Sequence, residues 1–169
     1  MPDDVAIIDT SSVIRIREIV VRAQLPVVFI KLTQLVQSDK LVFPKEVQDE
    51  LERWTNPDPN SQDPPLVWAQ LNAHLATRHV VKLETVKAVV NQVPEVIDED
   101  KLGVEEADPY VLALAIQLQE QGKQVTVLTE DRKDRPDKMS ITTACGVLRL
   151  PCLPVHVFLK RNGIWQPGS

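Results

Sequence analysis

Two carboxylates follow apolar runs typical of buried strands, one near each end of the chain. Asp9 comes directly after the apolar residues 5–8, and Asp131 follows the run at 125–129 after one intervening residue. In an open α/β sheet, ligands bind just beyond the carboxyl ends of the strands, so we expect both acids at the mouth of one crevice. Acidic sites of this kind mostly hold a divalent cation.

Two further acids fall near the ends of predicted elements. Glu50 lies on a predicted helix, and Glu46 lies four residues earlier on the same face, so either is a candidate for the site. Asp108 precedes Pro109, the position expected of a helix N-cap. Asp134, three residues past Asp131, is a fifth candidate, although a solvated loop charge explains it better. A solvated face would explain Glu50, and simple capping would explain Asp108.

The charge balance limits the kind of partner. The chain has 24 acidic and 19 basic residues, for a net charge of −5. A protein that only binds nucleic acid is normally basic, so this balance argues against stable, non-specific binding. The negative net charge does not exclude an enzyme that binds a polyanionic substrate through a metal ion. Basic residues do cluster beside the two strand-end acids, either to contact phosphates or as solvated charges: Arg15, Arg17, Arg132, Lys133, Arg135 and Lys138.

The elements that must position these acids alternate between short strands and helices. This alternation predicts an α/β fold with a mostly parallel sheet covered on both faces. A length of 169 residues predicts a single domain. The predicted strands are 5–8, 41–43, 125–129 and 147–150, and the predicted helices are 13–22, 26–37, 44–54, 66–75, 85–96 and 109–121.

Several local features are also expected. Ser11 or Ser12 should cap the first helix. Residues 55–65 hold four prolines and should form a loop. Residues 155–161 are either a helix or a strand, and the apolar helix at 26–37 is either a dimer surface or part of the core.

Cysteine and histidine give no sign of a zinc site. Cys145 and Cys152 have no metal-ligand spacing and are expected to be free thiols in a reducing cytosol. The oxygen ligands suit Mg²⁺ or Mn²⁺ instead. No apolar run approaches the roughly 18 residues of a membrane span, and the acidic N-terminus lacks a signal-peptide pattern. A cytoplasmic protein without membrane contact is therefore expected.

Four short blocks in this order resemble the PIN-domain superfamily of metal-dependent nucleases, which includes the VapC-type toxins. They are Ile-Ile-Asp-Thr-Ser-Ser-Val at 7–13, Val-Gln-Asp-Glu-Leu at 47–51, Ala-Asp-Pro-Tyr-Val-Leu-Ala-Leu-Ala at 107–115 and Leu-Thr-Glu-Asp at 128–131. The blocks cover most of the chain. The segment around residues 138–146 is similar to an uncharacterised PIN-like branch rather than to a well-studied toxin.

The resemblance implies a three-layer α/β/α sandwich and a metal-dependent endoribonuclease that hydrolyses phosphodiester bonds. The residues it implies as catalytic groups and as ligands of Mg²⁺ or Mn²⁺ are Asp9, Glu50, Asp108 and Asp131. RNA is expected as substrate ahead of DNA. The resemblance further implies the toxin of a toxin–antitoxin pair, with an antitoxin protein and a second copy of the chain as partners.

Two other readings compete with the nuclease. One is a catalytically silent PIN-like scaffold that binds protein or RNA. The other is a phosphoryl-transfer or receiver domain, because those also place an Asp after a first strand. The haloacid-dehalogenase pattern needs a second Asp two residues later, where this chain has Ser11, and the paired acids of a receiver are not evident. The five scattered glycines form no phosphate-binding loop.

Overall fold

A four-stranded parallel sheet runs through the protein, with the strand order β2-β1-β3-β4. The computed structural model describes residues 3–54, 63–98 and 106–168. The strands are β1 (Asp4–Ile8), β2 (Leu41–Val42), β3 (Gln124–Leu128) and β4 (Cys152–Leu153). β1 and β3 pair along their whole length, so that Ile8, the last residue of β1, lies opposite Leu128.

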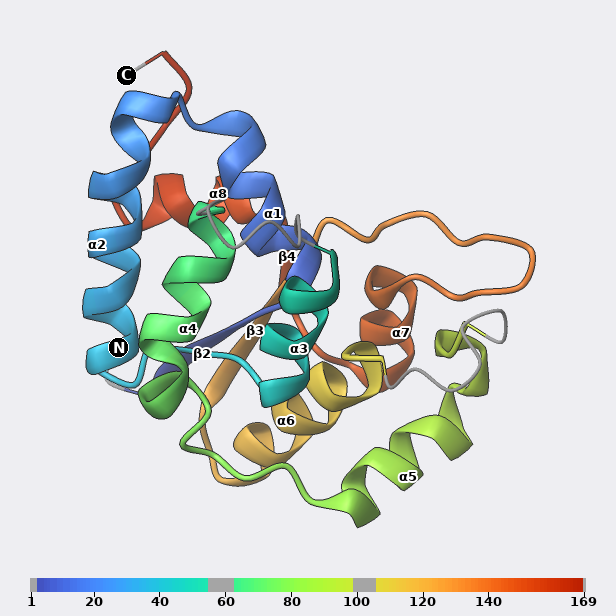
Figure 1. The fold of residues 1–169 in the computed structure, drawn as a ribbon. Coiled ribbons are helices and arrows are strands. Elements are labelled where there is room, and N and C mark those ends of the chain that lie inside the picture. Colours follow the sequence, from blue (N-terminus) through green and yellow to red (C-terminus); the bar gives the residue numbers. More distant parts are fainter. Residues whose placement is uncertain (1–2, 55–62, 99–105, 169) are drawn as a thin grey trace.

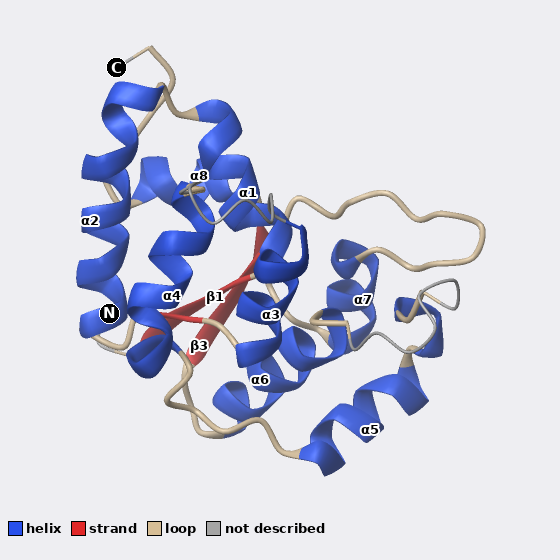
Figure 2. Cartoon of the chain, in the orientation of Figure 1, coloured by secondary structure: helices blue, strands red, loops and turns tan. Residues whose placement is uncertain are grey.

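Helices cover both faces of the sheet, which confirms the predicted three-layer α/β/α sandwich. Helices α2 (Leu25–Gln37) and α4 (Pro64–Ala76) contact β2, while α6 (Asp108–Glu120) contacts β1 and β3. Figure 1 shows α2 and α4 on one side of the strands and α6 on the other. Figure 2 shows how short the strands are beside the helices. The other helices are α1 (Thr10–Ile19), α3 (Lys45–Trp54), α5 (Leu83–Gln92), α7 (Ile141–Leu148) and α8 (Val155–Arg161), with 3-10 turns at Arg22–Gln24 and Pro94–Val96.

Helix α6 lies in the interior. Residues 111–115 are each at most 1% exposed, so this helix has no polar face over that stretch. Its sequence is apolar on all sides there, which suits a helix packed between the sheet and α5. Gly122 follows the helix with a φ of +87°, a left-handed conformation that favours glycine. The buried α6 thus fixes Asp108, its first residue, relative to the ends of β1 and β3.

Several predicted boundaries were wrong. The cap of α1 is Asp9 and not a serine, since the Asp9 side chain accepts a hydrogen bond from the backbone of Ser12. The predicted helix at 85–96 ends at Gln92, because Pro94 cannot continue it, and a 3-10 turn follows. The predicted strand at 147–150 is also wrong: α7 extends to Leu148, and the last strand is Cys152–Leu153.

The proline-rich segment was also bounded wrongly at one end. Pro64 and Pro65 form the first turn of α4, where proline is well tolerated, rather than the end of a loop. Residues 55–62 lie outside the described part of the chain. The open choice at 155–161 is resolved as helix α8.

Helix α2 belongs to the core on one side and is exposed on the other. Val28, Leu32 and Val36 are at most 1% exposed and belong to the core, whereas Val27 and Ile30 on the opposite side are 53% and 59% exposed. Among the described helices, none is by itself long and apolar enough to cross a membrane. Taken together, α1 and the segment Arg22–Gln37 pass that test of length and composition, but they form a pair bent by 118°.

Candidate functional site

A cleft opens at the carboxyl ends of β1 and β3. The chain passes from β1 to β2 on one side and later places β3 on the other side of β1, so the strand order reverses between β1 and β3. Such a reversal is where open α/β sheets bind ligands. The cleft has a volume of about 290 Å³, and all four predicted acids line it: Asp9, Glu50, Asp108 and Asp131.

Asp9 is the most deeply buried of these acids, with 3% of its surface exposed. Its Oδ1 accepts hydrogen bonds from the Ser12 backbone N–H (2.9 Å) and the Ser11 hydroxyl (2.8 Å). Its Oδ2 accepts one from the Thr129 hydroxyl at 2.5 Å. Burial raises the pKa of Asp9 to about 7, against the effect of these hydrogen bonds, and the charge of Asp108 adds to the rise. Asp9 is therefore both a helix cap and a cleft residue.

Glu50 joins three helices at the floor of the cleft. It is 4% exposed, and its Oε1 accepts a hydrogen bond of 2.5 Å from the Thr10 hydroxyl on α1. Its Oε2 accepts one of 3.3 Å from the backbone N–H of Ala107, just before α6. Glu46 is half-buried and is not among the described lining residues, so Glu50 is the acid of α3 that reaches the cleft.

Simple capping does not explain Asp108, because Ala107 occupies the cap position of α6 and Asp108 is the first helical residue. The Asp108 carboxylate instead meets Lys138: the Lys138 Nζ lies 2.8 Å from Asp108 Oδ2 and 3.6 Å from Asp131 Oδ2. Burial lowers the pKa of Lys138, but the charges of Asp108 and Asp131 outweigh burial and raise it overall. A charged amine thus lies between two of the four predicted acids.

Asp131 holds the start of α7. Its Oδ2 accepts a hydrogen bond from the Ile141 backbone N–H at 3.0 Å, and its carbonyl accepts from the backbone and the hydroxyl of Thr142. Its own N–H donates to the Thr129 hydroxyl at 3.0 Å. The same Thr129 hydroxyl donates to Asp9, so one side chain links both strand-end acids.

Replacing Asp131 with alanine is expected to lower the free energy of unfolding by about 1 kcal/mol, because a helix start loses a charged hydrogen-bond acceptor. Urea unfolding in the presence of EDTA measures this. Asp137→Ala is the matched control, since Asp137 is an exposed acid of the same loop. Equal stability of the Asp131→Ala variant and the wild type would rule out the capping role.

Two acids of the cleft were not foreseen from the sequence. Glu106 is 8% exposed, lines the cleft and accepts a hydrogen bond from the Asp98 backbone N–H at 2.9 Å. Glu130 also lines the cleft, and its Oε2 accepts from the Val155 backbone N–H at 3.0 Å. The signal for Glu106 was its place two residues before Asp108 in an acid-rich stretch, which composition alone does not distinguish from a solvated run.

Of the six basic residues considered for phosphate contacts, three line the cleft, whereas Arg132 is exposed and is not among the described lining residues. Lys133, Arg135 and Lys138 line the cleft. Arg15 instead pairs with Glu18 at 3.0 Å and lies 3.7 Å from Glu130, and Arg17 pairs with Asp63. Asp134 is exposed and accepts a hydrogen bond from the Ser140 backbone N–H, which lowers its pKa, and it is not among the described lining residues of the cleft.

The donor chemistry of the cleft suits a hard divalent cation, since its acids offer only oxygen ligands. In the described residues, however, no three acidic, histidine or cysteine side chains come together as a ready-made metal site. The Lys138 amine lies against one carboxylate oxygen of Asp108 and one of Asp131. The oxygens of these acids therefore suit Mg²⁺ or Mn²⁺ by their chemistry, while in this arrangement the Lys138 amine lies between two of the acids.

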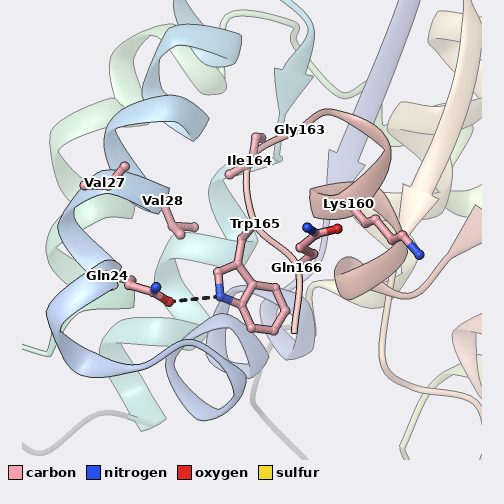
Figure 3. Close-up of a pocket in the computed structure, with 8 residues that line it drawn as sticks. All are labelled: Gln24, Val27, Val28, Lys160, Gly163, Ile164, Trp165 and Gln166. Carbon is pink, nitrogen blue, oxygen red and sulfur yellow. Dashed lines mark hydrogen bonds between the residues drawn. The ribbon is translucent and has the colours of Figure 1, made fainter. Parts of the chain in front are cut away.

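A second pocket, of about 480 Å³, lies between α2 and the segment after α8 (Figure 3). The indole N–H of Trp165 donates a hydrogen bond of 3.2 Å to the side chain of Gln24 across it. Lys160 is the one charged residue among those that line it. Without paired titratable groups, this pocket offers no acid–base or metal chemistry comparable to that of the acidic cleft.

Comparison with known proteins places this chain by family alone. No curated protein and no solved structure matches it. A family described as a domain of unknown function, DUF4411, matches residues 7–165. That match covers all the acids described as lining the cleft, the last two residues of β1 and the strands β2, β3 and β4. The chain therefore belongs to the DUF4411 family.

Proposed function

We propose that this protein is a metal-dependent endoribonuclease that hydrolyses phosphodiester bonds. One observation carries the proposal: four acids from separate parts of the sequence line a single cleft, at the point where the strand order reverses. The same cleft is lined by basic residues of the β3–α7 loop, Lys133 and Arg135, which suit contacts with phosphate oxygens. The PIN-like blocks of the sequence point to the same activity.

The chemistry assigns roles to the residues of this chain. Asp9, Glu50, Asp108 and Asp131 would hold Mg²⁺ or Mn²⁺. When bound, such ions activate a water molecule and stabilise the charge on the leaving oxygen. Thr129 fixes the orientation of Asp9, and Thr10 fixes that of Glu50. Lys133 and Arg135 would position the phosphate backbone at the rim.

Millimolar Mg²⁺ or Mn²⁺ is expected to raise the melting temperature of the wild-type protein. Metal at a hundredfold excess over its dissociation constant stabilises a fold by about 2.7 kcal/mol. The Asp9→Asn variant should lose that gain together with cleavage of single-stranded RNA. Thermal melts and a gel-based cleavage assay with both proteins test this. A wild-type melting temperature that neither metal changes would contradict the proposal.

A catalytically silent scaffold is the second candidate, and the ion pair between Lys138 and Asp108 favours it, because that amine already neutralises part of the acid set. Such a scaffold would bind RNA or protein without cleavage and without any dependence on metal. Cleavage by the wild type that Asp9→Asn abolishes would exclude it.

The biological role that we propose is the toxin of a toxin–antitoxin pair acting on RNA in the cytoplasm. The two cysteines are free thiols, which fits a reducing compartment. A small antitoxin gene beside this one, whose product relieves growth arrest on co-expression, would support the role. Growth that is unaffected by expression of the protein alone would count against it.

A further inference from the structure

Lys138 is placed unusually for a lysine. Its side chain is only 9% exposed, whereas those of its two partners, Asp108 and Asp131, are 18% and 31% exposed. Its Nζ lies 2.8 Å from one carboxylate and 3.6 Å from the other. Most lysines keep their ammonium in water, so this one is held at the cleft by the acids themselves.

The backbone that carries Lys138 is fastened on several sides. Lys138 and Arg135 exchange two backbone hydrogen bonds, of 2.8 and 3.2 Å. Arg135 also pairs with Asp98 at 3.0 Å, and the N–H of Met139 donates to the Glu95 carbonyl at 2.6 Å. Residue 138 is therefore anchored at its backbone, and a four-carbon stem with rotatable bonds allows the ammonium more than one position without any movement of that backbone.

We propose that Lys138 is a built-in cation of the cleft, which neutralises Asp108 and Asp131 in the metal-free protein and which a divalent cation must displace. This inference rests on the proposed function, because it concerns metal binding at the same acids. Asp108, whose Oδ2 accepts from Nζ, is one of the four acids that would hold the metal. Two cations within about 4 Å of each other repel strongly in a partly buried site.

The displacement has a consequence for the substrate. An ammonium released from the two acids remains tethered at the cleft, beside Lys133 and Arg135. A phosphate oxygen of a bound nucleic acid is then its natural partner. Metal and a polyanionic substrate should therefore bind with positive coupling, since each favours the displaced position of Lys138, and coupling of this kind is reciprocal.

Lys138→Met tests the inference, because methionine keeps an unbranched stem and removes the charge. Isothermal titration with Mn²⁺ should show binding that is tighter than that of the wild type by about tenfold or more, as expected when a competing charge is removed. Lys87→Met is the matched control: it removes the same charge from an exposed lysine of α5 that is not among the described residues lining the cleft, and it should leave Mn²⁺ affinity within about twofold. Lys138→Arg keeps the charge and should retain wild-type affinity.

A second measurement uses the unmodified protein and does not depend on whether a variant folds. Acylation of lysines followed by mass spectrometry should label Lys138 slowly in EDTA and several times faster in Mg²⁺, as the amine leaves the carboxylates. Labelling of Lys87, which does not line the cleft, should not change. Labelling of Lys138 that is unchanged or slower in Mg²⁺ would overturn the inference.

The outcomes separate this inference from the proposed function. If the wild type binds Mn²⁺, Asp9→Asn does not, and Lys138→Met binds no more tightly than the wild type, Lys138 is not a competitor and the proposed function stands. If Asp9→Asn binds Mn²⁺ as well as the wild type does, the acids are not the metal site, and both ideas fail. Tighter binding by Lys138→Met that is lost when Asp9→Asn is added supports both.

Discussion

Asp9→Asn is expected to stabilise the metal-free protein by up to about 4 kcal/mol at pH 8 while it abolishes RNA cleavage. Burial raises the pKa of Asp9 from its ordinary value of 3.8 to about 7. One pKa unit corresponds to about 1.4 kcal/mol, so ionising this side chain in the folded state is costly. Asparagine carries no charge, caps helices as well as aspartate does and keeps one oxygen for Ser11 and Ser12.

The sign of the pH dependence follows from linkage. Between pH 3.8 and about 7, the folded protein holds the Asp9 proton more tightly than the unfolded chain does, so the contribution of Asp9 to stability falls as the pH rises. It is constant below that window and constant again above it. The free energy of unfolding of the wild type should therefore fall between pH 5 and pH 8, and that of Asp9→Asn should fall less. Urea unfolding in EDTA at both pH values measures this.

The loss of cleavage by Asp9→Asn should be at least about a hundredfold, because groups that only orient metal ligands already cost 10–100-fold when mutated. Added Mg²⁺ should stabilise the wild type and leave the variant unchanged. A variant that is more stable yet inactive would mean that the buried charge of Asp9 is retained for function at the expense of the fold. Unchanged activity in Asp9→Asn would remove Asp9 from the site.

The layers of this fold could be predicted from the sequence alone, because the patterns that indicate strands and helices are local. Residues 5–8 and 125–129 were read as strands from short apolar runs, and in the structure they pair along their whole length. Parallel strands share one carboxyl edge, so the meeting of Asp9 and Asp131 at one cleft followed from the topology alone. Asp108 reaches the same cleft as the first residue of α6, and Glu50 reaches it from the second half of α3, where Trp54 also lines the cleft.

The errors in the predicted cap and strand arose where the same residues are compatible with two local conformations. Asp9, Ser11 and Ser12 are all good caps, and only the end of β1 decides that Asp9 is the one that caps α1. Three of the four residues at 147–150 are apolar, and periodicity over so few residues does not separate a strand from the last turn of a helix. Arg149 adopts a left-handed φ of +58° and ends α7 there, which the sequence does not signal with glycine.

The position of Lys138 could not be read from the sequence, because it depends on a long-range contact. Lys138 was grouped with the other basic residues after Asp131 as a phosphate contact or a solvated charge. Its approach to Asp108, 30 residues away along the chain, requires the β3–α7 loop to turn back at Arg135 and Lys138. Figure 1 shows this loop projecting from the sheet before it returns to α7. Loop geometry of this kind produces no periodic pattern in the amino-acid sequence.

Glu50→Ala is expected to lower the free energy of unfolding by about 3 kcal/mol. The substitution removes a buried carboxylate and leaves the Thr10 hydroxyl and the Ala107 N–H without their partner. A buried donor left unsatisfied costs about 1–3 kcal/mol, and the cavity adds to that. Since Glu50 joins α1, α3 and the start of α6, the loss should also loosen the position of Asp108.

Two companion variants separate the structural role of Glu50 from its role in the cleft. Glu50→Gln keeps the shape and one acceptor, so it should recover more than half of the lost stability but not RNA cleavage. Glu46→Ala, one turn earlier on α3, should change stability by less than about 1 kcal/mol and leave cleavage intact. Urea unfolding and the cleavage assay on all three variants measure both effects. If Glu46→Ala rather than Glu50→Gln abolished cleavage, the second acid of the site would be Glu46, and the cleft would have to rearrange on binding its substrate.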